Sequence, residues 1–333
     1  MKLKYTKPIT GTWFEFRHHN AKEGVYWDNT LQNFTEEQWR AKIREMKECG
    51  MKYAVLLSTT LNSKTYFKSS VFEERWELAC NDPIEVVLDE ADKVGLNIFL
   101  SNGFYGNWRE TGRNMTHPRD IMSNAEILRR TCVAMNELTE LYGHHSSFYG
   151  WYYPDETWIN KYMDESFIEY VNYSSAEMHK LGKRFKSLIS PYGTKDLVAD
   201  DKYISDLARL DVDICAYQDE VGVQKSSYDD TAAYYEALKK AHDKAGRSVL
   251  FGNAEAFRFE GQVYQSALLP APFERLQKQI EAMSPYVEEI FIYQYPGLIS
   301  KPESVAQLGH ADAEKLYVDY INYRKKLETE GVK

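Results

Sequence analysis

Two acidic side chains stand at the ends of apolar segments, where packing alone explains them poorly. Glu156 follows the aromatic run 148–153 and Pro154, and Glu255 ends the run 248–254. An unpaired carboxylate beside a buried segment is costly, so these positions favour a chemical role. Two carboxylates can cleave a glycosidic bond, because one protonates the leaving oxygen while the other attacks carbon or activates water.

The elements that must position these acids follow one repeated pattern. Short apolar runs alternate eight times with amphipathic segments, and such runs are typical of parallel strands buried on both faces. The Thr35 to Gln38 spacing predicts a helix start, and Gly95 and Gly246 predict helix ends. The expected strands are 9–16, 52–59, 97–104, 148–156, 185–192, 212–220, 248–257 and 289–296. The expected helices are 35–49, 83–95, 123–142, 164–181, 198–210, 231–245, 272–284 and 311–327.

Eight strand–helix units over this length predict an α/β fold of one domain, a (β/α)8 TIM barrel covering residues 1–333. A doubly wound open sheet is the alternative, and it is disfavoured because no glycine-rich turn follows the first strand. In a (β/α)8 barrel the active site lies at the carboxyl ends of the strands. Strands four and seven face each other across such a barrel, so we expect Glu156 and Glu255 to converge at its mouth.

The other strand ends are rich in amides, acids and aromatic rings, which suit a hydroxyl-rich ligand. Either His18 or His19, in the loop after the first strand, is expected to bind a sugar hydroxyl. Trp13 and Tyr192 are further candidates for stacking a sugar ring. The candidate substrate-binding residues are His18, Asn102, Trp108, Trp158, Tyr217, Gln218, Asp219, Glu220, Asn253, Tyr293 and Gln294.

Two questions about the acids remain open at this point. Asp219 and Glu220 form a rival pair, and Glu220 could replace Glu255 as the second carboxylate. Asp155 precedes Glu156, and neighbouring side chains of a strand point to opposite faces, so we expect Asp155 to brace a loop or helix.

Glutamates at the ends of strands four and seven resemble the acid/base and the nucleophile of the large clan of retaining glycosidases with (β/α)8 barrels. The resemblance implies that Glu156 is the acid/base and that Glu255 is the nucleophile, for which we expect Tyr293 and Asn253 to donate hydrogen bonds. The clan commonly has Asn before the acid/base, where this chain has Asp155.

The segments GWYYPDE (150–156), YQDEVG (217–222) and NAEAF (253–257) resemble a glycosidase-like barrel family, domain of unknown function 4434. This resemblance covers nearly the whole chain. It implies a carbohydrate-active hydrolase but supplies no substrate. Together with the paired carboxylates, it leads us to expect a hydrolase that cleaves an oligo- or polysaccharide and needs no cofactor.

Two other functions fit the same residues. A metal-dependent sugar isomerase or epimerase would hold a divalent ion with Glu156, Asp219, Glu255 and a histidine, although few histidines stand at strand ends. A carbohydrate-binding protein without catalysis would use the same groove.

Composition limits the partners. Aromatic residues make up 14% of the chain, with 25 Tyr and 7 Trp, which favours a ligand with flat apolar faces such as a sugar. The net charge of −9, without a basic run, argues against nucleic acid. No segment is apolar enough for membrane insertion, and the four scattered Cys lack metal spacing. The first residues show no signal core, which predicts a cytoplasmic protein unless a signal peptide was trimmed from an exported one.

Overall fold

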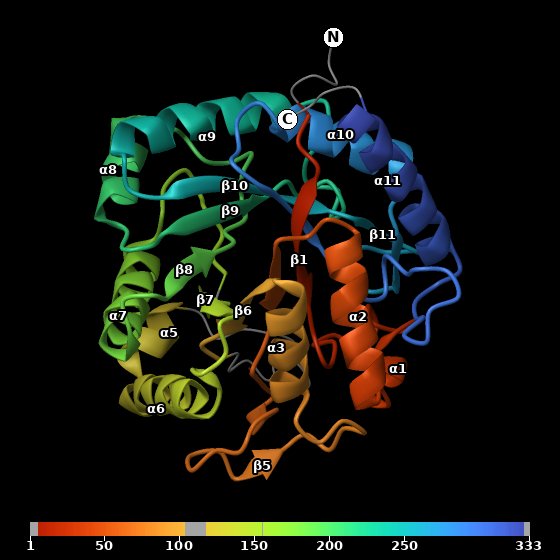
Figure 1. Ribbon diagram of the computed structural model, residues 1–333. Coiled ribbons are helices and arrows are strands. Elements are labelled where there is room, and N and C mark those ends of the chain that lie inside the picture. Colours follow the sequence, from red (N-terminus) through yellow and green to blue (C-terminus); the bar gives the residue numbers. More distant parts are fainter. Residues whose placement is uncertain (1–5, 104–117, 155, 330–333) are drawn as a thin grey trace.

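The computed structural model describes residues 6–103, 118–154 and 156–329, with the backbone alone for 118–120. Its centre is a closed barrel of eight strands, in which every strand runs parallel to both neighbours (Figure 1). The predicted (β/α)8 barrel is therefore confirmed, and each expected strand is present. The barrel strands are β1 (Ile9–Phe14), β2 (Tyr53–Leu56), β6 (Asn97–Ser101), β7 (Phe148–Tyr152), β8 (Lys186–Ile189), β9 (Ile214–Gln218), β10 (Val249–Glu255) and β13 (Ile290–Tyr293).

Helices surround the barrel on its outside (Figure 1). The predicted capping box is present, because Thr35 accepts a hydrogen bond from the Gln38 amide and Gln38 accepts one from the Thr35 amide. Gly95 and Gly246 end their helices in the left-handed conformation, with φ of 68° and 60°. The helices are α1 (Asp28–Gln32), α2 (Glu36–Glu48), α3 (Pro83–Val94), α5 (Pro118–Ser123), α6 (Ala125–Tyr142), α7 (Glu165–Leu181), α8 (Asp201–Arg209), α9 (Thr231–Ala245), α10 (Phe273–Met283) and α11 (Asp312–Thr329).

The core has two layers, because successive strand side chains point to opposite faces of the sheet. Side chains such as Trp13, Phe99 and Tyr152 fill the inside of the barrel. Their neighbours, such as Trp151 and Tyr217, point outward into the larger layer between strands and helices. The strand ends therefore present a fixed alternation of inward and outward side chains to the mouth of the barrel.

Two small sheets extend the loops at the carboxyl ends of the strands, and the sequence pattern did not predict them. β3 (Thr60–Leu61), β4 (Lys64–Thr65) and β5 (Glu74–Arg75) form one sheet after β2. β11 (Phe257–Phe259) and β12 (Leu268–Pro270) form an antiparallel hairpin that begins two residues after β10 ends. The hairpin continues the line of β10 beyond the barrel and so raises one wall of the mouth.

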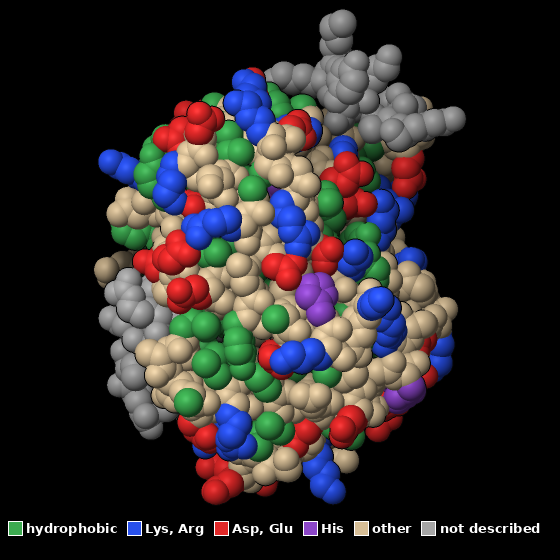
Figure 2. All heavy atoms as spheres, turned by 90° about the vertical axis from the view of Figure 1, so that its left-hand side faces the viewer, with side chains coloured by type: hydrophobic (Ala, Val, Ile, Leu, Met, Phe, Trp, Pro, Cys, Tyr) green, Lys and Arg blue, Asp and Glu red, His purple; other side chains and the backbone are tan. Residues whose placement is uncertain are grey.

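The surface is of mixed charge where α7 and α8 lie. Acidic and basic side chains are interspersed over that face rather than gathered into separate regions (Figure 2). Over the residues that the structure describes, no helix combines the length and the apolar character needed to cross a membrane.

Candidate active site

A pocket of about 370 Å³ opens at the carboxyl ends of the barrel strands. Its floor includes Trp13 of β1 and Leu57, which also belong to the core inside the barrel. Its walls combine strand ends, the hairpin β11–β12 and the loops that follow β1 and β9. The remaining lining residues are His19, Glu23, Glu156, Tyr192, Gln218, Glu220, Val223, Lys225, Asn253, Glu255, Phe257, Phe259, Tyr264, Leu268 and Tyr293.

Glu156 reaches the pocket just after β7. Pro154 lacks an amide hydrogen, which suits the end of a strand, and the Glu156 amide already turns back to the Pro154 carbonyl at 2.8 Å. Tyr152, inside the barrel, donates its hydroxyl to Glu156 Oε1 at 3.1 Å. Burial raises the pKa of Glu156 to about 7, although hydrogen bonds from Gln218 and Tyr152 oppose the shift. Near neutral pH this carboxyl can therefore both give and take a proton.

Glu255 is the last residue of β10 and is 3% exposed. Its Oε2 accepts a hydrogen bond from the Val223 amide at 2.8 Å. Gly222 allows this contact, because a Cβ there would lie 2.9 Å from Glu255 Oε2 and 2.8 Å from the Phe257 carbonyl oxygen. Burial and the nearby charge of Asp219 raise the pKa of Glu255 well above its usual range.

The donors expected for Glu255 differ from those found. The Asn253 side-chain amide donates instead to Ser190 Oγ at 3.1 Å. The Tyr293 hydroxyl has no hydrogen-bond partner among the described residues. The loop after β9 brings the Val223 amide to the Glu255 carboxylate. The strand pattern of the sequence does not predict the conformation of this loop.

The rival acids Asp219 and Glu220 occupy different places. Asp219 lies behind the pocket, where it accepts the Glu255 amide at 3.1 Å and Gln279 Nε2 at 2.6 Å. Glu220 adopts a positive φ of 55° and turns into the pocket lining. Its Oε2 accepts the amides of Gly193 and Thr194, both at 2.9 Å. Asp219 therefore supports the end of β10, whereas Glu220 ties the loop after β8 to the pocket.

A buried polar network follows β1. Glu15 Oε1 lies 2.6 Å from His18 Nδ1 and accepts hydrogen bonds from Trp27 Nε1 at 3.0 Å and Gln294 Nε2 at 2.8 Å. His18 Nε2 lies 3.5 Å from Glu23 Oε2 on the pocket side. Burial disfavours a charged imidazole, but the Glu15 and Glu23 carboxylates raise the pKa of His18 to about 10. His18 is thus a buried imidazolium between two carboxylates.

Twelve of the thirteen predicted site residues lie in the described part of the chain, and half of these line the pocket. Six line it, namely Glu156, Gln218, Glu220, Asn253, Glu255 and Tyr293. Six others do not belong to the lining, namely His18, Asn102, Trp158, Tyr217, Asp219 and Gln294. Trp108, like the expected brace Asp155, lies outside the described residues.

Each residue away from the pocket has another environment. Tyr217 points outward, with its hydroxyl 2.7 Å from that of Tyr203 and 3.1 Å from His242 Nε2. Asn102 donates to Ser174 Oγ on α7 at 3.2 Å. Trp158 is 49% exposed and donates its indole N–H to Asp196 at 3.0 Å. Of the two neighbouring histidines, His18 is buried behind the lining, whereas His19 reaches the pocket.

Several lining residues were not predicted, among them Glu23, Lys225 and Tyr264. All three lie in loops, where side-chain direction depends on the loop conformation rather than on a repeating pattern. A weak signal existed for Glu23, because it is an acid close after the first strand end. Lys225 lies 3.8 Å from Glu220 Oε1 and over the rings of Tyr192 and Tyr264.

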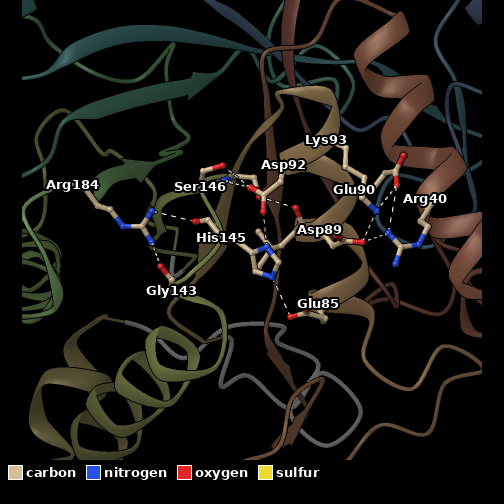
Figure 3. A network of polar contacts seen from close by, with 12 residues as sticks. Arg40, Glu85, Asp89, Glu90, Asp92, Lys93, Gly143, His145, Ser146 and Arg184 are labelled. Carbon is tan, nitrogen blue, oxygen red and sulfur yellow. Dashed lines mark hydrogen bonds and ion pairs between the residues drawn. The ribbon is translucent and has the colours of Figure 1, made fainter.

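Two groups among the described residues bring histidine and acidic ligand atoms together. Glu15, His18 and His19 form one, and within it Glu15 Oε1 already contacts His18 Nδ1 at 2.6 Å. Glu85, His144 and His145 form the other, at the opposite end of the barrel. Figure 3 shows His145 between Glu85 and Asp92 of α3. Neither group contains the acids Glu156, Asp219 and Glu255 that a metal-dependent reaction would use.

Comparison with known proteins gives a family and a fold. Residues 9–306 match the family described as Domain of unknown function (DUF4434). No curated protein matches the sequence. The fold is similar to that of a proposed alpha-L-fucosidase from Bacteroides thetaiotaomicron, with 20% identity, a TM-score of 0.72 and coverage of 98% of this chain and 96% of the other.

Two mannanases have a similar fold. The endo-1,4-beta-D-mannanase of Thermotoga petrophila shares 10% identity with a TM-score of 0.60, over 96% of this chain and 100% of the other. The endo-1,4-beta-mannanase of Rhizomucor miehei shares 11% identity with a TM-score of 0.61, over 96% and 95%. At these identities the similarity establishes the barrel fold and leaves the activity to be argued from the site.

Proposed function

We propose that this chain, which belongs to the family of domain of unknown function 4434 over nearly all of its length, is a glycoside hydrolase acting with retention of configuration. The observation that carries the proposal is one pocket lined by the carboxyls of both Glu156 and Glu255. Glu156 comes just after β7, and Glu255 is the last residue of β10. Around the closed barrel, two strands lie between β7 and β10 on one side and four on the other. The glycosidase names of proteins with a similar fold agree with the proposal.

Glu156 is proposed as the acid/base. With a pKa of about 7 it carries a proton in a large share of molecules near neutral pH, and it can give that proton to the glycosidic oxygen as the bond breaks. The hydrogen bond from Tyr152 fixes the position of Oε1. In the second step the ionised Glu156 removes a proton from water, which then attacks the glycosyl–enzyme ester.

Glu255 is proposed as the nucleophile, although its raised pKa opposes ionisation before a substrate binds. The transition state of glycoside cleavage carries positive charge on the sugar, and this charge favours the carboxylate form at the moment of attack. The Val223 amide orients Oε2 and leaves Oε1 for the anomeric carbon. Retention requires the two carboxyl groups to lie about 5–5.5 Å apart.

Glu255→Gln tests the nucleophile. We expect turnover of the best substrate among 4-nitrophenyl and 2,4-dinitrophenyl glycosides to fall at least about 10³-fold, because an amide cannot form the ester. Sugar binding should remain, since the side chain keeps its size and an acceptor oxygen. Full activity in this variant would refute the assignment. Glu289→Gln, just before β13, provides a control with the same chemical change away from the pocket.

Glu156→Gln tests the acid/base with the same substrates. The loss should be large for 4-nitrophenyl glycosides and small in the first step for 2,4-dinitrophenyl glycosides, because dinitrophenolate leaves without protonation. For the wild-type protein, proton NMR of the anomeric configuration of the first product tests retention directly. An inverted product would contradict the proposed mechanism.

A further inference from the structure

Glu23 differs from the other carboxylates of the pocket, because it comes from a loop rather than from the end of a strand. It follows β1 by nine residues and still lines the pocket, with 11% of its side chain exposed. The β11–β12 hairpin holds this loop in place, since the Leu268 amide donates to the Glu23 carbonyl at 3.0 Å. The backbone of Glu23 is therefore fixed against the β11–β12 hairpin, which forms part of the pocket wall.

The carboxylate of Glu23 is also fixed from behind. Asn20 Nδ2 donates to Oε1 at 2.8 Å, and His18 Nε2 lies 3.5 Å from Oε2. Burial alone would raise its pKa, but the hydrogen bonds and the histidine charge lower the pKa of Glu23 below its ordinary value. Each oxygen has a second lone pair, so an ionised Glu23 can accept two hydrogen bonds from a ligand.

Acidic side chains outnumber basic ones around the pocket, and Glu23 is the acid whose pKa is lowered, whereas burial raises the pKa of Glu156, Glu220 and Glu255. Among the described lining residues, Glu23, Glu156, Glu220 and Glu255 are acids, and Lys225 is the single Lys or Arg. Lys225 lies 3.8 Å from Glu220, so its charge is partly balanced there. Burial and the His18 charge lower the pKa of His19 to about 4, so this lining residue is neutral near pH 7. A carboxylate on the ligand would therefore meet repulsion.

Resting on the proposed function, we infer that Glu23 binds a pair of neighbouring sugar hydroxyl groups and makes the pocket select neutral sugars over uronic acids. Oε1 and Oε2 accept one hydroxyl each, while Asn20 and His18 hold the carboxylate plane. His18 acts as a positioning residue, because it reaches the ligand only through Glu23. The Glu15 carboxylate balances the histidine charge, so the network delivers a negative charge to the pocket wall.

The test measures binding without turnover. In the Glu255→Gln background, calorimetry compares methyl glucoside, galactoside, mannoside and fucoside with methyl glucuronide and galacturonide, using both anomers. At least one neutral glycoside should bind, and its uronide counterpart should bind at least about tenfold more weakly. Adding Glu23→Gln should weaken the neutral glycoside about tenfold and strengthen the uronide about tenfold, because the charge is removed while the shape is kept.

Recognition by Glu23 predicts that the two affinities change in opposite directions, whereas damage to the fold would weaken the binding of both ligands. Three results would overturn the inference. Glu23→Gln could weaken the binding of both ligands equally, the protein with Glu23 intact could bind the uronide more tightly than the neutral glycoside, or it could bind neither class. Glu85→Gln is the matched control, since Glu85 contacts His145 at 3.1 Å as Glu23 contacts His18. A protein that shows this selectivity but hydrolyses no glycoside would instead refute the proposed function.

Discussion

Two histidines of this barrel, His18 and His145, each lie between two carboxylates, but at opposite ends of the barrel strands. His18 follows β1 at the carboxyl end, and its ring nitrogens lie 2.6 Å and 3.5 Å from acidic oxygens. His145 precedes β7 at the amino end, with corresponding distances of 2.7 Å and 3.1 Å (Figure 3). The chemistry is nearly the same, and the carboxylates raise the pKa of both histidines although burial opposes this.

The two sites differ in the exposure of the acids. The Glu15 side chain is fully buried and that of Glu23 is 11% exposed. At His145 the Glu85 and Asp92 side chains are 44% and 29% exposed. Water screens the second site much more than the first, so equal geometry does not imply equal energy.

The difference shows what the position in the barrel adds. At the amino end, Asp92 also accepts the Ser147 amide and so joins α3 to the start of β7. At the carboxyl end, the same arrangement leads through Glu23 to the pocket wall. We therefore expect changes at His18 to affect both stability and binding, and changes at His145 to affect stability.

The largest effect is expected from His18→Leu. The substitution leaves Glu15 as a buried carboxylate without its countercharge, which costs about 3–5 kcal/mol in the free energy of unfolding. Urea unfolding followed by tryptophan fluorescence measures this loss. The surviving folded protein should also bind neutral glycosides at least about tenfold more weakly, because Glu23 loses one of the two groups that orient it. A loss of stability as small as that of His145→Leu would contradict the comparison.

His145→Leu should cost about 1–2 kcal/mol, since its acids stay hydrated and solvent screens the interaction. The activity of the folded protein should equal that of the wild type, because the change lies at the end of the barrel away from the pocket. Urea unfolding and glycoside turnover per folded molecule provide the two measurements. A matching drop in turnover would show that the two ends of the barrel are coupled.

The sequence predicted the barrel well for a physical reason. Buried parallel strands must be apolar throughout, so each of the eight left a strong local signal, and their carboxyl ends pointed to Glu156 and Glu255. The inward or outward direction of each strand side chain could not be predicted in the same way, because an all-apolar strand does not show which side chains face inward. Tyr217, for example, faces outward. Strands of two or three residues, as in the hairpin β11–β12, are too short to show a period. Glu23 depends on loop conformation, which the pattern does not encode.

The smallest expected effect is a difference in pH dependence between the two histidines. Each folded-state pKa is raised above the unfolded value of about 6.5, so each contribution to stability is full below that pH and declines as the pH rises through the folded pKa. For His18, which faces Glu15, Glu23 and His19, the decline extends to about pH 10.

For His145, which faces Glu85 and Asp92, the exposure of the acids makes the shift smaller, so the decline should be complete at a lower pH. The stability difference between wild type and His145→Leu should therefore shrink by less than that between wild type and His18→Leu between pH 6.5 and 8.5. Over the same interval the difference for His18→Leu should shrink by about 2 kcal/mol, because between the unfolded pKa of about 6.5 and the folded pKa of about 10 only the folded state keeps the proton, which changes stability by about 1.4 kcal/mol per pH unit. Urea unfolding of all three proteins at both pH values measures this, and a parallel decline at the two sites would mean that burial of the acids does not set the strength of the interaction.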